Sequence, residues 1–185
     1  AAQYRHIVFS FCVVTMLCWG SWANTQKLAA KTWRFELFYW DYVIGILLFS
    51  IISAFTIGSF GESGRSFTDD LKHADTANLF SAFLGGIIFN AANILFSAAI
   101  AIAGMAVAFP VAIGLALVLG VIINYAASQK GDPAYLFAGV ALVAIAIIIN
   151  AIAYKRSDSS KQKASAKGIV ISLVAGVLMS FFYRF

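Results

Sequence analysis

The longest stretch of this chain without a charged side chain runs from Thr76 to Gln129. As a single helix rising 1.5 Å per residue it would measure about 80 Å, far more than the hydrocarbon core of a bilayer. We therefore predict two membrane spans, over 78–102 and 105–127, with a tight turn near Ala103 and Gly104. Such a stretch excludes an ordinary water-soluble domain, because its solvent must be lipid.

Composition extends this interpretation to the whole chain. Of its 185 residues 62% are hydrophobic and 11% charged, against about 25% charged in a typical soluble domain. The apolar runs do not alternate as the strands of a membrane barrel would, so we predict an all-α polytopic membrane protein. Besides the two spans above, four more are predicted: 7–23, 39–60, 135–154 and 168–185.

The basic residues predict the orientation in the membrane. The formal net charge of +5 sits in short clusters between apolar runs, which indicates membrane topology and not nucleic-acid binding. The positive-inside rule puts the richer side in the cytoplasm and the N-terminus outside, in a bacterial inner membrane. The richer side carries Lys27, Lys31, Arg34, Lys155, Arg156, Lys161, Lys163 and Lys167, and the other carries Arg5, Arg65, Lys72 and Lys130.

The first and last spans align with each other. HIVFSFCVVTMLCW, residues 6–19, lies over GIVISLVAGVLMSF, residues 168–181, with three identities: Ile7 and Ile169, Val8 and Val170, Ser10 and Ser172. Five spans separate the two starts, so these helices cross in opposite directions, as in the inverted repeats of secondary transporters. We expect a first five-helix repeat over 6–154, a cytoplasmic linker over 155–167, and over 168–185 the first helix of a truncated second repeat.

A polar stripe marks the third span. Gly86, Asn90, Asn93 and Ser97 recur at helical spacing on one face. They either bond a neighbouring helix, at about 0.6 kcal/mol each, or line a path for a polar solute. Both interpretations stay open.

Three other sequence features each have two possible interpretations. Asp41, the one acid at the edge of a predicted span, either caps the second helix beside Arg34 or binds a coupling ion. Trp19-Gly20-Ser21-Trp22 is either a kinked helix end facing a cavity or part of an interfacial belt. Pro110 bends the fourth span and serves either packing or a hinge. The belt itself is predicted from Trp33, Phe35, Phe38, Tyr39, Trp40 and Tyr42.

Signatures of an enzyme are missing from the sequence. The two histidines, His6 and His73, flank spans, and no zinc-protease, nucleophile-elbow or phosphate-loop motif occurs. We therefore expect no catalysis, no cofactor and no metal. Cys12 and Cys18 are six residues apart in one apolar run, on different faces of a helix, so we expect free thiols.

Three motifs together resemble the drug/metabolite transporter superfamily, nearest its sugar porters and ureide permeases. These are W-G-S-W at 19–22, Y-W-D-Y at 39–42, and the two glycines and asparagine of 85–93. The resemblance implies ten helices in two inverted five-helix halves around a central site, with alternating access. This chain departs from that pattern by ending at Phe185, inside the sixth helix, so the other half lies beyond it.

We therefore expect a permease for a small polar solute, a sugar or a nitrogenous metabolite, with proton coupling as an open option. Its partners would be the solute, the bilayer, the missing C-terminal half and a second copy in a dimer, but no nucleic acid. The alternative is a non-transporting membrane subunit of a larger complex. The candidate residues are Asn90, Asn93, Ser97, Trp19 and Trp22 for the solute, Asp41 for the coupling ion, and Pro110 and Gly20 as hinges.

Overall fold

The computed structural model describes residues 2–60, 64–129, 131–156 and 165–184, and this described part is helical without a strand. Five of its helices are long and apolar enough to cross a membrane, as an all-α polytopic membrane protein requires: Val8–Ala29, Phe35–Phe55, Thr76–Ala103, Met105–Ser128 and Pro133–Ala153. The chain forms two compact units, Ala1–Ile44 and Gly45–Phe185. The predicted linker over 155–167 falls largely on 157–164, outside the described residues.

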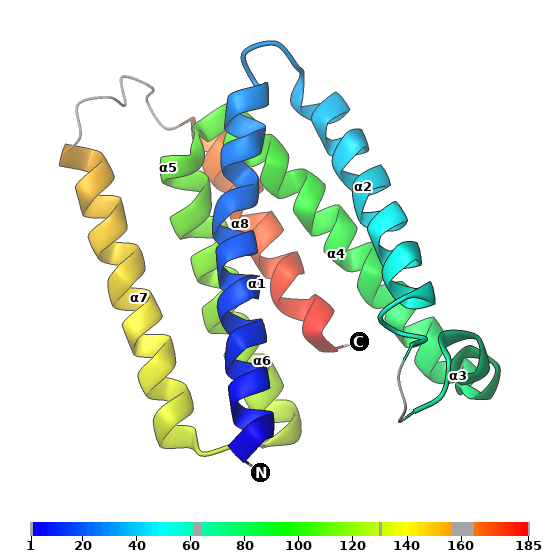
Figure 1. The fold of residues 1–185 in the computed structure, drawn as a ribbon. Coiled ribbons are helices and arrows are strands. Elements are labelled where there is room, and N and C mark those ends of the chain that lie inside the picture. Colours follow the sequence, from blue (N-terminus) through cyan, green and yellow to red (C-terminus); the bar gives the residue numbers. More distant parts are fainter. Residues whose placement is uncertain (1, 61–63, 130, 157–164, 185) are drawn as a thin grey trace. The chain divides into compact units, whose positions relative to one another are not determined.

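The first unit contains helix α1, Ala2–Ala29, and the start of helix α2, Phe35–Phe55 (Figure 1). Helix α1 runs past the predicted end of the first span and is continuous through residues 19–22, which does not favour the interpretation of a kinked helix end there. Polar side chains here bond back to carbonyls of their own helix and leave it intact. The Ser21 hydroxyl donates to the Leu17 carbonyl at 2.6 Å, and that of Thr25 donates to the Trp22 carbonyl.

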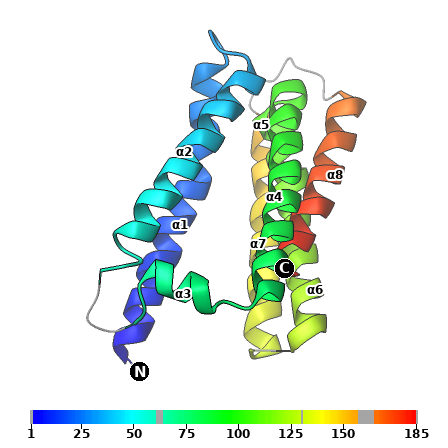
Figure 2. The same ribbon diagram turned by 90° about the vertical axis from the view of Figure 1, so that its right-hand side faces the viewer.

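The second unit begins with the rest of α2 and the short helix α3, Phe67–His73. Ser66 caps α3 by accepting from the Asp69 N–H at 3.4 Å, and Phe67 packs edge-on against Phe55 with ring centroids 5.5 Å apart. Helix α4, Thr76–Ala103, follows with Asp75 as its cap. These contacts hold the α2–α4 connection at one end of the unit (Figure 2).

The predicted turn at Ala103 and Gly104 is confirmed. Gly104 has φ +80°, a conformation that favours glycine and ends α4. The fourth span then consists of three pieces: helix α5 over Met105–Ala108, a π-helical turn η1 over Phe109–Ile113, and helix α6 over Gly114–Ser128. Helix α7, Pro133–Arg156, follows Gly131 and Asp132, and the Ala134 N–H donates to the Asp132 carboxylate at 2.8 Å.

The last helix forms the centre of this unit. Helix α8, Ala166–Phe181, ends in a single 3₁₀ turn, η2, over Phe182–Arg184. It lies along α4 in the opposite direction and also packs on η1 and α6 (Figures 1 and 2). Its buried residues include glycine or serine at every fourth position, which lets helices approach closely in lipid. They are Gly168, Ser172, Gly176 and Ser180.

A compact apolar core joins these helices. Ala92 of α4, Ala116 of α6 and Met179 of α8 are buried together, and the Phe89 and Phe182 rings cover them with centroids 4.8 Å apart. Helix α7 stays at the edge of the unit, and its most apolar 18-residue window has no buried residue. Such an exposed apolar surface suits a helix that faces lipid.

Candidate functional site

The polar stripe on α4 is divided by the packing of the unit. Gly86 and Asn90 are exposed, whereas Asn93 is 3% exposed and Ser97 is fully buried. Asn93 lies on the packed face of α4, because the residues three, four and seven positions after it, Phe96, Ser97 and Ile100, are buried as well. The stripe therefore contains a buried pair, Asn93 and Ser97, one turn apart, and an exposed pair.

The chemistry of the buried pair suits a planar amide. Burying a carboxamide away from water costs free energy unless its groups are hydrogen-bonded, and in this structure both Asn93 and Ser97 have interaction partners. A carboxamide presents two N–H donors and a carbonyl acceptor, and a hydroxyl can donate or accept. Together they complement a solute that carries amide N–H and C=O groups in one plane.

In the first unit, aromatic rings join α1 to α2. The Trp22 and Tyr42 rings are stacked, with centroids 5.5 Å apart and an interplanar angle of 23°. Tyr39 adds a tilted ring 5.8 Å from Tyr42 and is only 6% exposed. The belt prediction is thus wrong for Tyr39, because helical spacing turns it with Tyr42 toward the packed side of α2. Trp33 and Trp40 are exposed, as belt residues should be.

Gln26 is a buried polar residue that the sequence analysis missed. It lies one turn beyond Trp22 on the same face of α1 and is 3% exposed, next to the fully buried Ala23. The adjacent Lys27 made this segment look like a loop. The signal that could have found Gln26 is its four-residue spacing from Trp22, which places both on one helix face if α1 continues.

The other predicted site residues of the first unit do not pack with the rings of Trp22, Tyr39 and Tyr42. Asp41 is exposed, on the side of α2 away from Tyr39. Trp19 and Gly20 are also exposed, and no atom lies within 4 Å of the place where a Cβ on Gly20 would be. Helix α1 passes Gly20 without interruption, so its role as a hinge stays a prediction.

Pro110 produces a π turn in place of a simple bend. Proline has no N–H to donate, and the π turn that contains it, Phe109–Ile113, widens the helix. The Gly114 N–H at its end donates to the carbonyls of Phe109 and Val111. The turn packs against α8, because a Cβ on Gly176 would lie 2.7 Å from the Ala112 carbonyl oxygen. π turns are frequent at functional sites, which keeps Pro110 a hinge candidate.

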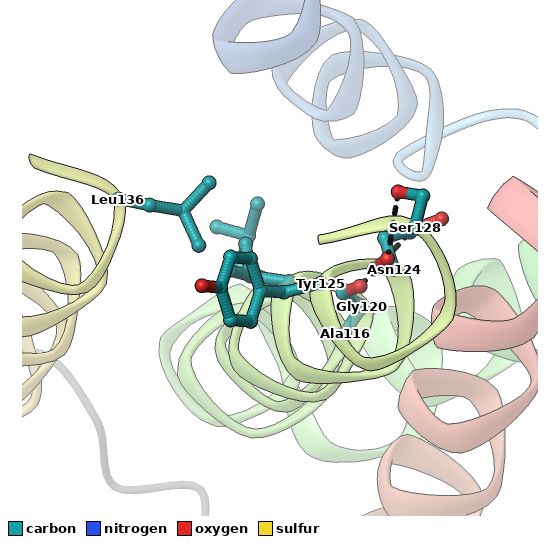
Figure 3. A pocket seen from close by; sticks show the side chains of 8 residues that line it. Ala116, Gly120, Asn124, Tyr125, Ser128 and Leu136 are labelled. Atoms are coloured by element: carbon teal, nitrogen blue, oxygen red, sulfur yellow. Dashed lines mark hydrogen bonds between the residues drawn. The ribbon is translucent and has the colours of Figure 1, made fainter. Parts of the chain in front are cut away.

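A pocket of about 280 Å³ opens beside α6 (Figure 3). Its polar groups bond their own helix: the Asn124 amide donates to the Gly120 carbonyl at 2.9 Å, and the Ser128 hydroxyl to the Asn124 carbonyl at 3.1 Å. None of the predicted site residues lines it, so it is not our candidate site. The lining residues are Ala116, Leu117, Gly120, Val121, Asn124, Tyr125, Ser128 and Leu136.

Comparison with known proteins gives one consistent family. Residues 38–172 match the family model described as Ureide permease. The chain is 28% identical over 158 residues to "Ureide permease 3" of Arabidopsis thaliana, covering 84% of this chain and 46% of that protein. It is 29% identical over 160 residues to "Ureide permease 2" of the same plant, covering 84% and 40%. "Probable ureide permease A3" of Vigna unguiculata is 27% identical over 150 residues, covering 78% and 40%. The chain thus spans less than half the length of these relatives, and no solved structure matches it.

Proposed function

Because this chain belongs to the ureide permease family, we propose that it is part of a transporter that carries a small, polar, nitrogenous solute across a membrane. The related proteins are named as permeases, which are transporters and not enzymes. These matches support the ureide permease branch of the resemblance noted in the sequence. They give no support to the sugar porters or to the wider drug/metabolite superfamily, and a hexose is not part of the proposal.

The observation that carries the proposal is the burial of Asn93 beside Ser97 in a helix long enough to span the membrane. Polar side chains inside a membrane usually face the bundle interior, where they bond a neighbouring helix or line a path for a solute. A ureide holds N–H donors and a carbonyl acceptor in one plane, which a carboxamide can match with both kinds of group. Trp19 and Trp22 of the first unit stay separate candidates for solute binding from the sequence, and the stack on Tyr42 fixes the ring of Trp22.

The proposed mechanism is alternating access between two inverted repeats. Residues 6–154 form the first repeat, 155–167 the linker, and 168–185 begin the second. Pro110 and Gly20 are the proposed hinges, and Asp41 couples transport to protons. The cytoplasmic location of the side richer in lysine and arginine, with the N-terminus outside, belongs to the proposal as well. The bacterial inner membrane gains no support, since the relatives are plant proteins.

Ligand-induced thermal stabilisation of the full-length protein tests the solute class. A ligand present at 100 times its Kd stabilises the folded state by about 2.7 kcal/mol. We expect a cyclic ureide to raise the melting temperature, and a hexose not to do so. Asn93→Ala should abolish this rise, while Asn124→Ala, whose amide bonds its own helix, should retain it.

Two results would contradict the proposal. Stabilisation by the hexose alone would exclude a nitrogenous solute as the ligand. An equal loss of stabilisation in the Asn93 and Asn124 variants would exclude a specific role for Asn93. If no solute of the panel bound, the alternative of a non-transporting membrane subunit would be favoured.

A further inference from the structure

The packing of α8 gives a pattern with which α1 can be compared. Two of its glycines approach the backbone of the second unit closely: a Cβ on Gly168 would lie 2.5 Å from the Ala103 Cβ, and one on Gly176 lies against the Ala112 carbonyl. Between and beyond them, Ser172 and Ser180 are fully buried. Helix α8 thus docks by one narrow face into a groove formed by α4 and the π turn.

Helix α1 has a partly similar face at the equivalent positions, identical at one of the four. The alignment that places His6 over Gly168 also places Ser10 over Ser172, Val14 over Gly176, and Cys18 over Ser180. Ser10 and Ser172 even make the same hydrogen bond, each to the carbonyl four residues earlier at 2.8 Å. The matched face of α1 is nevertheless exposed, with Val14 at 56% and Leu17 at 61%.

This face differs from the one that α1 uses within its hairpin. Trp22, Ala23 and Gln26 lie on the packed side. Helical spacing turns Ser10, Val14 and Leu17 away from Ala23 and Gln26, whereas Cys18, one turn before Trp22, lies at the border between the two faces. Helix α1 therefore has two faces with different patterns. One is occupied in the α1–α2 hairpin, and the other corresponds to the docked face of α8.

We propose that this second face, Ser10, Val14, Leu17 and Cys18, docks on the second repeat of the same protein, as α8 docks on the first. In this arrangement, the first helix of each repeat packs against the helices of the other repeat. The inference depends on the two-repeat architecture of the proposed function. The occupant is the second repeat because the curated relatives are more than twice the length of the aligned region. Val14 stands in the place of Gly176, so the groove for α1 must be wider at this level.

The two native cysteines provide a direct test in the full-length protein. Both are free and exposed in this structure. Cys18 corresponds to the buried Ser180, whereas Cys12 corresponds to the exposed Val174. In liposomes, a membrane-permeant maleimide should modify Cys18 about tenfold more slowly than Cys12, or slower still, because α1 must undock first. Peptide mass spectrometry gives the two rates, and denatured protein serves as the control.

The two thiols lie at similar distances from the ends of α1. Cys12 follows the first residue of the helix, Ala2, by ten positions, and Cys18 precedes the last, Ala29, by eleven, so depth in the bilayer alone would give similar rates. Equal rates, or a faster Cys18, would mean that lipid covers this face and would overturn the proposal. Protection of Cys18 that disappears when the protein is dispersed to monomers in detergent would assign the face to a second copy, which would also overturn it.

Tryptophan substitution adds a second, independent readout. Val14→Trp should lower the melting temperature of the full-length protein by several degrees, while Cys12→Trp should leave it nearly unchanged. The matched pair on α8, Gly176→Trp and Val174→Trp, calibrates the method. If the α8 pair differs and the α1 pair does not, the proposal fails. Neither readout uses a solute, so this failure is distinct from a failure of the proposed transport function.

Discussion

Replacing Gly176 with alanine would place a methyl group against the backbone of the π turn. The new Cβ would lie 2.7 Å from the Ala112 carbonyl oxygen, 3.1 Å from its Cα and 3.2 Å from the Leu115 Cβ. The first distance is well inside van der Waals contact. Two of the three atoms are backbone, so they cannot move aside by a change of rotamer.

The change in folding stability caused by Gly176→Ala is the balance of two opposing effects. Overpacking of a well-packed interface typically costs about 1–3 kcal/mol. Exchange of glycine for alanine in a helix returns about 0.5–1 kcal/mol through lower backbone entropy in the unfolded chain. Because the clash is with backbone atoms, the cost lies in the upper part of this range, about 2–3 kcal/mol. We therefore expect Gly176→Ala to destabilise the protein by about 1–2.5 kcal/mol, a change of roughly 5- to 70-fold in the folding equilibrium.

Gly139→Ala on α7 is the matched control, because no atom lies within 4 Å of the Cβ it would add. It retains the entropic gain and lacks the clash, so its stability should equal or slightly exceed that of the parent. Thermal and denaturant unfolding of the purified protein in detergent measure both variants. If Gly176→Ala were as stable as Gly139→Ala, the close approach of α8 to the π turn would be refuted.

Three further changes test the proposed roles of individual residues. Asp41→Asn should abolish uphill accumulation in vesicles while leaving solute exchange, because it removes the proton site; unchanged accumulation would remove the coupling role. Trp22→Leu should weaken solute binding and cost about 0.5–1.5 kcal/mol of stability through loss of the stack on Tyr42. Trp40→Leu, at an exposed position, should do neither, and equal effects would argue against the cluster. Pro110→Ala restores a backbone N–H and should slow transport without loss of stability, whereas an unchanged transport rate would exclude the hinge.

The span pattern could be predicted because it depends on local chemistry. The uncharged run of 76–129 is too long for one crossing, and glycine is the residue that tolerates the positive φ found at Gly104. The end of α1 could not be placed from hydropathy, since Gln26 and Lys27 resemble loop residues. The structure shows both residues in α1, with Gln26 buried on the same face as Trp22, whose ring stacks on Tyr42 of α2.

The candidate site was predicted less completely, because burial depends on which helices meet. The stripe of Asn90, Asn93 and Ser97 follows from helical spacing alone. The division between exposed Asn90 and buried Asn93 is set by where packing on α4 stops. In the same way, Pro110 predicts a lost hydrogen bond, but the π turn depends on the carbonyls to which Gly114 donates.

Uptake of a radiolabelled cyclic ureide into vesicles that contain the full-length protein tests the central claim most directly. We predict saturable uptake that unlabelled ureide inhibits and excess hexose does not, and that Asn93→Ala strongly reduces while Asn124→Ala does not. Vesicles whose uptake equals that of protein-free controls, or uptake of the hexose in place of the ureide, would contradict the account.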